Sequence, residues 1–294
     1  MADKRSSASK IKMERFDDLF GIGSGEQDGR DKIIMIPLEQ LYDFNGHPFK
    51  VLDDEKMEET VESIRLYGVL NPALARPRTE GGYELLSGHR RKRGSGLAGL
   101  KEMPVIVREY TDDEAAIIMV DSNIQREDIL PSEKAKAYKV KYEAMKHQGK
   151  KADMNTLDKV GEAAGENAKK VQRYLWLSRL SEELLDMVDK KKLGFSQGVD
   201  ISFLSEKEQQ WVQVILEEQG CSINTVQSGK LKEYGKKGEL TFAMVRLILT
   251  EEKVKTRKVT LKADKISKYF DDGCSSEEIE NTILRLLEEW KNGQ

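Results

Sequence analysis

The chain has 294 residues, of which 38% are hydrophobic and 34% charged, which is enough apolar material for two or three small folded units. Lys and Arg number 49 against 52 Asp and Glu, so the net charge of −3 excludes a globally basic nucleic-acid coat and leaves only local basic patches. The 2 cysteines and 3 histidines lack the spacing of a disulfide scaffold or an HExxH metal site, and no apolar run approaches the roughly 20 residues of a membrane span. We therefore expect a cytoplasmic protein without membrane contact.

The first segment, residues 1–30, is polar and weakly patterned, and it is predicted to form a mobile tail. Within it, residues 15–23 (RFDDLFGIG) are a short apolar island with flanking charge. This island either folds back on the body of the protein or serves as a docking peptide for a partner.

The next segment alternates strand and helix signals and predicts a compact α+β unit over residues 31–130. Strands are expected at residues 33–38, 73–77, 83–87 and 104–110. One helix is expected from a cap at Asp53 or Asp54 to about residue 67, where Gly68 can end it, and another over residues 112–126.

A basic junction follows the strand at 83–87 and reads SGHRRKRG over residues 87–94. A helix that begins there presents free backbone N–H groups and the positive end of its dipole, and neighbouring arginines can grip phosphate oxygens. The junction therefore predicts a site for a polyphosphate or a phosphodiester, although a run of basic residues can also be a solvated face. It is not a Walker A loop.

A second polar segment, DSNIQRED over residues 121–128, crowds amide, guanidinium and carboxylate groups into one turn. It is either part of the same site or a polar interdomain linker.

Residues 131–255 are predicted to be helices joined by short loops, beginning with Pro131 in a first helical turn. Leu157 and Val160 share an apolar face, Gly165 interrupts the helix and Asn167 can cap the next one, which is helix-turn-helix spacing. The alternative is an ordinary helical hairpin with a solvated basic face. The candidate DNA-binding residues are Asn167, Lys169, Lys170, Gln172 and Arg173, with Gln172 and Arg173 as base contacts and the two lysines as phosphate contacts.

Residues 256–294 predict one strand, at residues 258–261, and a final helix. Ile279, Ile283, Leu286, Leu287 and Trp290 form an apolar stripe on that helix. The stripe either joins two copies of the chain or packs back onto the helical middle.

Three ordered blocks, residues 38–77, 83–107 and 122–138, resemble the ParB family of chromosome and plasmid partition proteins. The second block is similar to the family's GERR box, and the third to its ENxQRxxLxPxExAxAY box. The resemblance implies an α+β ParB/sulfiredoxin-like N-terminal domain, an all-α helix-turn-helix domain and a small C-terminal strand-helix dimerisation element. Sulfiredoxin chemistry itself is excluded, because this unit has no cysteine.

The resemblance also implies a cytidine triphosphate (CTP) site with magnesium. The residues that correspond are Gly88, His89, Arg90, Arg91, Asn123, Gln125, Arg126 and Glu127, with Asn123 also as the metal ligand. Two single positions and one turn depart from the family: His89 and Ser122 replace glutamates, and His47-Pro48-Phe49 replaces Gln-Pro-Arg, of which only the proline is kept. Because magnesium normally takes a carboxylate, Ser122 weakens the expectation of a slow CTP hydrolase, and no catalytic residue is assigned.

The implied function is a CTP-dependent clamp on double-stranded DNA that acts in the partition of a plasmid, a chromosome or a mobile element. Its expected partners are a centromere-like DNA site, a second copy of the chain and a ParA-type ATPase at residues 15–21, and its expected place is the nucleoid or a plasmid. Two alternatives stay open: a nucleotide-independent transcriptional or copy-number regulator, and a phosphotransferase or nuclease with Glu127 as its base.

Overall fold

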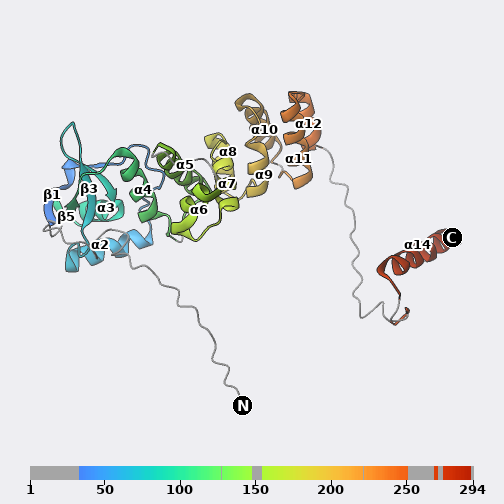
Figure 1. Cartoon of the computed structure of the whole chain (residues 1–294), viewed down its shortest axis with the longest axis horizontal. Coiled ribbons are helices and arrows are strands. Elements are labelled where there is room, and N and C mark those ends of the chain that lie inside the picture. The colour runs from blue at the N-terminus through green and yellow to red at the C-terminus, as the bar shows by residue number, and fades with distance from the viewer. Residues whose placement is uncertain are drawn as a thin grey trace, which may run out of the picture. The chain divides into compact units, whose positions relative to one another are not determined.

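The computed structural model describes residues 33–126, 128–147, 154–220, 222–250, 268–270 and 274–292 (Figure 1). The chain divides into two compact units, Met1–Leu249 and Thr250–Gln294. The tail predicted over residues 1–30 and the strand predicted at residues 258–261 lie outside the described residues. None of the described helices is long and apolar enough to cross a membrane.

The strands among the described residues form one five-stranded sheet in the order β1-β5-β3-β4-β2. β1 pairs with β5 and β3 pairs with β4 in antiparallel fashion, whereas β3 and β5, and β2 and β4, run parallel. The elements are β1 (Ile33–Pro37), the 3-10 helix η1 (Leu38–Gln40), β2 (Leu41–Asp43), β3 (Ala73–Pro77), β4 (Tyr83–Ser87) and β5 (Glu102–Val107).

This mixed sheet confirms the predicted α+β class of the first region. β3 and β4 have the predicted bounds, β1 ends at Pro37, and β5 begins and ends earlier than predicted. β2 was not predicted from the sequence, because three residues give no alternation to detect. Its pairing with β4 places Asp43 opposite Leu85, two residues before the end of that strand.

α2 (Glu55–Tyr67) confirms the helix predicted before Gly68. The Asp54 carboxylate accepts a hydrogen bond from the backbone N–H of Met57 at 2.9 Å, and Gly68 ends the helix with a φ of 70°. α2 packs closely on α3 (His89–Leu97), since a Cβ added at Gly94 would lie 3.1 Å from Ile64 Cδ1.

α4 (Asp112–Asn123) and α5 (Pro131–His147) pack side by side through an apolar seam that includes Met119, Val120 and Tyr138. α4 begins with a capping box between Thr111 and Glu114 and ends earlier than the predicted residue 126. One ion pair interrupts the seam: Lys141 Nζ lies 2.5 Å from Asp121 Oδ1, and the Lys141 side chain is only 5% exposed.

The described residues from Pro131 to Thr250 are helical with short connections, as predicted. Their largest apolar core gathers fully buried side chains such as Leu177, Leu184, Ile201 and Val212. The elements after α5 are α6 (Met154–Gly161), the 3-10 helix η2 (Glu162–Ala164), α7 (Ala168–Leu177), α8 (Glu182–Asp189), α9 (Phe195–Ile201), α10 (Glu206–Gln219), α11 (Thr225–Lys237) and α12 (Phe242–Thr250).

In the second unit, the described residues contain one long helix, α14 (Ser276–Asn292). Its apolar stripe is open to solvent in the single chain, because Leu286, Leu287 and Trp290 are 54%, 54% and 65% exposed. The predicted role of this stripe in self-association stays a prediction.

Candidate nucleotide and DNA sites

The basic junction is built on a glycine between β4 and α3. Gly88 has a φ of 107°, which is in the left-handed region, and it lies against β3. His89 begins α3, so the first N–H groups of this helix point away without helical partners. The result is the positive helix end that the sequence predicted.

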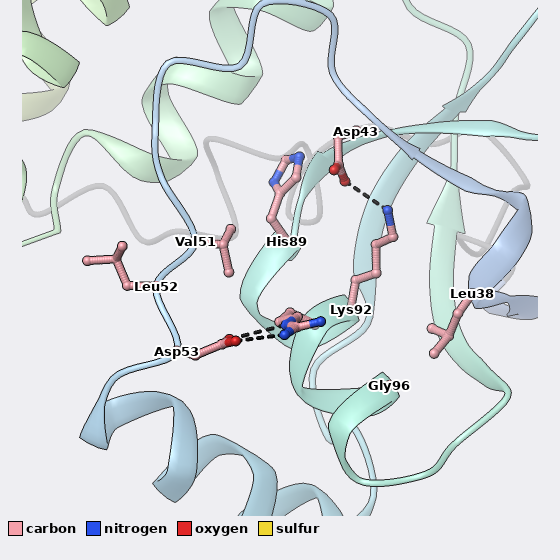
Figure 2. Close-up of a pocket in the computed structure, with 9 residues that line it drawn as sticks. Leu38, Asp43, Val51, Leu52, Asp53, His89, Lys92 and Gly96 are labelled. Atoms are coloured by element: carbon pink, nitrogen blue, oxygen red, sulfur yellow. Dashed lines mark hydrogen bonds and ion pairs between the residues drawn. The ribbon is translucent and has the colours of Figure 1, made fainter.

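One face of α3 lines a cavity of about 560 Å³ (Figure 2). His89, Lys92, Arg93 and Gly96 share this face because residues three and four apart lie together on a helix. The other lining residues are Leu38, Asp43, Val51, Leu52 and Asp53. Lys92 and Arg93 were not assigned a role from the sequence, although helical spacing from His89 was a signal that could have found them.

Carboxylates already pair with the cations around this cavity. Arg93 makes a two-pronged contact with Asp53, at 2.6 and 3.1 Å, and Lys92 Nζ lies 2.8 Å from Asp43 (Figure 2). The hydrogen bond from Arg93 holds the pKa of the Asp53 carboxyl below its usual value. An entering anion would therefore have to replace these carboxylates as the hydrogen-bond partner of Lys92 and Arg93.

Arg90 and Arg91 leave α3 in other directions. Arg90 Nη2 lies 3.0 Å from the Asp54 carboxylate that caps α2. Arg91 Nη1 donates to the carbonyl oxygens of Asn71 and Pro72 at 2.6 and 2.7 Å, which fastens the chain just before β3. Arg90 would have to release only the Asp54 side chain, which is 42% exposed, whereas Arg91 would have to give up two backbone contacts to reach a phosphate.

The polar turn after α4 is only partly directed toward the cavity. Asn123 donates its amide to Met119 O at 2.9 Å, and Gln125 donates to Ala163 O at 3.0 Å, next to the helix-turn-helix. Arg126 lies near enough to His89 to lower its pKa through charge. Glu127 lies outside the described residues.

The described residues do not fit a magnesium site on their own. No group of three or more His, Cys, Asp or Glu side chains among them could hold a metal ion. Asn123, the predicted ligand, donates its amide nitrogen to Met119 O and so offers only one neutral oxygen, and the neighbouring Ser122 hydroxyl donates to Met119 O at 3.0 Å.

His89 is buried at the start of α3. Its side chain packs against His47, with ring centroids 3.9 Å apart, and the residue is 7% exposed. Burial, followed by the nearby His47, lowers the pKa of His89 to about 3. The imidazole is therefore neutral near pH 7.

The second candidate site lies on α6, η2 and α7. Gly165 takes a φ of 64° before α7, and the Asn167 side chain accepts a hydrogen bond from the backbone N–H of Lys170 at 3.0 Å. The turn is tight, since a Cβ at Gly161 would lie 2.2 Å from Glu166 O. These contacts give the predicted helix, glycine turn and capped second helix.

The predicted DNA-binding side chains differ in how freely they reach solvent. Lys169 is exposed and Gln172 is half-buried. Lys170 Nζ lies 2.8 Å from Glu166, and Arg173 donates to Ser196 Oγ at 2.8 Å while its guanidinium lies over the Phe195 ring. Asn167 caps α7 with its side chain, so its established contact is with the backbone.

The first turn of α5 contacts both sites through adjacent side chains. The buried Glu133 accepts from the backbone N–H of Lys50 at 2.8 Å, in the loop that carries His47. Lys134 Nζ lies 2.6 Å from the buried carboxylate of Glu166, just before α7. Sequence patterns gave no signal for either contact, because each joins residues far apart in the chain.

Comparisons with known proteins relate this chain to one family by sequence. Residues 24–124 match the family model described as the ParB N-terminal domain. The probable chromosome 1-partitioning protein ParB of Deinococcus radiodurans is 32% identical over 201 residues, which cover 68% of this chain and 66% of that protein. The chromosome-partitioning protein Spo0J of Thermus thermophilus is 30% identical over 196 residues, covering 67% of this chain and 69% of that protein.

Solved structures also match. The crystal structure of the C-terminally truncated chromosome-partitioning protein ParB from Caulobacter crescentus complexed with CTP-gamma-S is 27% identical, with a TM-score of 0.31. The match covers 64% of this chain and 98% of that chain. The chain thus spans about two thirds of the length of the two partition proteins above.

Proposed function

Because this chain belongs to the ParB family of chromosome-partitioning proteins, we propose that it is a nucleotide-controlled DNA clamp. Double-stranded DNA binds at α6, η2 and α7, and a cytidine triphosphate binds at the cavity beside α3. The bound nucleotide closes two copies of the N-terminal region around the DNA, and the clamp serves the partition of a chromosome, a plasmid or a mobile element.

The first turn of α5 is the observation that carries this proposal. Glu133 and Lys134 are adjacent in sequence, yet one holds the loop beside the nucleotide cavity and the other holds the turn before α7. A ligand that moves one of these contacts also changes the other. Such a shared element allows nucleotide and DNA to influence each other's binding.

The chemistry of the α3 cavity supports an anionic ligand. A helix N-terminus, Lys92 and Arg93 supply positive charge, and their present carboxylate partners are exposed enough to be displaced. The choice of cytosine rests on the resemblance of the two sequence boxes.

The proposal is tested by titrating CTP into the full chain, with and without a duplex that carries its DNA site. We expect binding that the duplex strengthens, and weaker binding in the Arg90→Ala variant. The matched control is Arg65→Ala on α2, because the Arg65 side chain donates to Leu97 O at the far end of α3. Undetectable CTP binding in both conditions overturns the proposal.

The alternative of a nucleotide-independent regulator makes a different prediction for the same variant. Arg90→Ala would then occupy and spread along DNA like the parent protein. A DNA-spreading assay with both proteins separates the two functions.

The role of α5 is tested separately with Glu166→Gln, which weakens the contacts of Glu166 with Lys134 and Lys170. We expect CTP binding without DNA to stay unchanged and the strengthening by DNA to shrink. Glu182→Gln is the matched control. Glu182, on α8, pairs with Lys136 of α5 in an exposed position. If Glu166→Gln keeps the full effect of DNA, this link does not couple the sites.

The proposed partners follow from the same family membership. Two copies are proposed to associate through the apolar stripe of α14, and a two-fold pair suits a palindromic DNA site. A ParA-type ATPase is proposed to bind residues 15–21, which lie outside the described residues. The expected place of action is the nucleoid or a plasmid in the cytoplasm.

A further inference from the structure

Two histidines meet at the nucleotide cavity in an arrangement that leaves polar atoms without partners. His47 Nδ1 lies 2.7 Å from Phe49 O, which fixes the proton on Nδ1 and leaves a lone pair on Nε2. Nε2 of His47 and both ring nitrogens of His89 are buried and have no hydrogen-bond partner among the described residues. Buried polar groups are normally paired, so this cluster is incomplete in the free protein.

His89 lines the cavity (Figure 2), and its ring packs at a tilt against the ring of His47. Both residues depart from the glutamate and glutamine of the resembled motifs. A glutamate at position 89 would repel a polyphosphate, whereas an imidazole can gain a proton and attract it.

Charged groups face the pair from four elements. These are Asp43 on β2, Lys92 on α3, Arg126 after α4 and Glu133 on α5. Asp43 is paired with Lys92, and Glu133 accepts from the backbone N–H groups of Lys50 and Leu130. Both nearby carboxylates are therefore engaged elsewhere, and neither ring nitrogen of His89 has a hydrogen-bond partner among the described residues that would hold a proton on the ring.

We propose that His89 binds the phosphate chain of the nucleotide as an imidazolium, taking up one proton when the ligand enters, and that His47 positions its ring. This inference rests on the proposed nucleotide site, in which the resemblance already includes His89, and adds to it the charge state of His89, the proton taken up and the positioning role of His47. Binding brings negative charge next to His89 and gives its N–H groups an acceptor, and both effects favour the charged ring.

The sign of the pH effect follows from the proton balance. Burial lowers the pKa of His89 to about 3 in the free protein, so the ring is neutral there. Because the complex holds one more proton than the free protein, nucleotide affinity rises as pH falls. The rise approaches about tenfold for each pH unit below the pKa that His89 has in the complex.

Calorimetry on the full chain tests this inference. CTP is titrated from pH 5.5 to 8.0, in buffers of different ionisation enthalpy, so that the protons taken up are counted. The proteins are the parent, His89→Gln, His47→Gln and the control His147→Gln, which changes the remaining histidine of the chain at an exposed position on α5. CTP takes up protons of its own near pH 6.5, and the control protein corrects for this.

We expect the parent and His147→Gln to take up the same number of protons and His89→Gln to take up about one fewer. His47→Gln is expected to bind more weakly but still to take up the proton. Equal uptake by the parent and His89→Gln, with CTP bound to both, overturns the inference and leaves the proposed function intact.

Inorganic triphosphate is the second ligand, and it tests the imidazolium site separately from the proposed nucleotide function. If it binds with His89-dependent proton uptake while CTP does not bind, the imidazolium site stands and the nucleotide function falls. If neither ligand binds the parent protein, both fall.

A measurement on the parent protein removes any dependence on the folding of variants. Imidazole carbon shifts in NMR report the charge of each histidine, and the chain has only 3. We expect the His89 signal to be that of a neutral ring at pH 6 without ligand and of an imidazolium when CTP saturates the protein. A neutral His89 in the saturated complex contradicts the inference.

Discussion

Gly88 and Ala73 approach each other so closely that a Cβ added at position 88 would lie 2.8 Å from the Cβ of Ala73. The φ of 107° at Gly88 adds a conformational cost for any other residue. We therefore expect Gly88→Ala to lower the free energy of unfolding by about 2–3 kcal/mol, measured by urea denaturation. Gly99→Ala is the control, because Gly99 has a φ of 87° but nothing within 4 Å of an added Cβ. Equal losses in the two variants would show that the contact with Ala73 has no effect.

The burial of His89 makes the fold sensitive to mild acid. Since burial lowers its pKa to about 3 from 6.5, the folded chain binds fewer protons than the unfolded chain between these values. Stability is therefore lost as pH falls below 6.5, approaching about tenfold in the folding constant per pH unit for this group. Urea midpoints at pH 7, 6 and 5 should fall less in His89→Gln than in the parent. His147→Gln should follow the parent, and a parallel fall in all three proteins would contradict this reading.

The contact between Asp53 and Arg93 competes with an entering anion. Asp53→Asn leaves Arg93 in place and removes the charge that holds it. We expect CTP or inorganic triphosphate to bind about two- to fivefold more tightly, a range typical of an exposed ion pair, in a titration at constant salt. Glu80→Gln removes a similar exposed pair with Arg78 and should leave affinity unchanged. Weaker binding in Asp53→Asn would mean that Asp53 supports the ligand rather than competing with it.

DNA affinity should depend on α7 in a salt-sensitive way. Lys169→Ala removes an exposed cation, so the slope of log affinity against log salt should fall by about one unit across all sequences. Arg173→Ala should lower discrimination between cognate and unrelated duplexes as well as affinity. Lys190→Ala, which removes an exposed lysine paired with Asp186 on α8, is the control. Fluorescence anisotropy at several salt concentrations measures both effects, and an unchanged slope in Lys169→Ala would exclude this face as the DNA contact.

Self-association should depend on one face of α14. Leu286 lies within the apolar stripe and Asn281 on the opposite side of the helix, so the same charge can be placed on either face. We expect Leu286→Glu to shift a dimer toward monomer and Asn281→Glu to leave it unchanged, measured by light scattering after size exclusion. If the parent protein is monomeric, the stripe would instead pack against another part of the same chain.

In the first region, the sequence predicted the bounds of helices and strands well wherever one residue or one turn determines where the element begins or ends. The Asp54 cap and Gly68 set the bounds of α2, and the turn-rich segment between β3 and β4 set the bounds of both strands. β2 escaped prediction because its pairing with β4, rather than its own three residues, makes it a strand.

The candidate site was harder to predict, because its contacts join distant segments. Arg91 was grouped with Arg90 by sequence, yet it turns to the carbonyls of Asn71 and Pro72. His47 gained its place only through packing on His89, and no periodic pattern connects the two. Gln125 likewise turns toward Ala163, a partner that only the packing of α4 near η2 provides.

The ion pair of Lys141 and Asp121 limits how α4 and α5 can rearrange. Sliding one helix along the other by a turn would leave the buried Lys141 ammonium group without its carboxylate partner, which is unfavourable. Any movement of α4 relative to α5 is therefore expected to keep this pair or to give Lys141 another anionic partner.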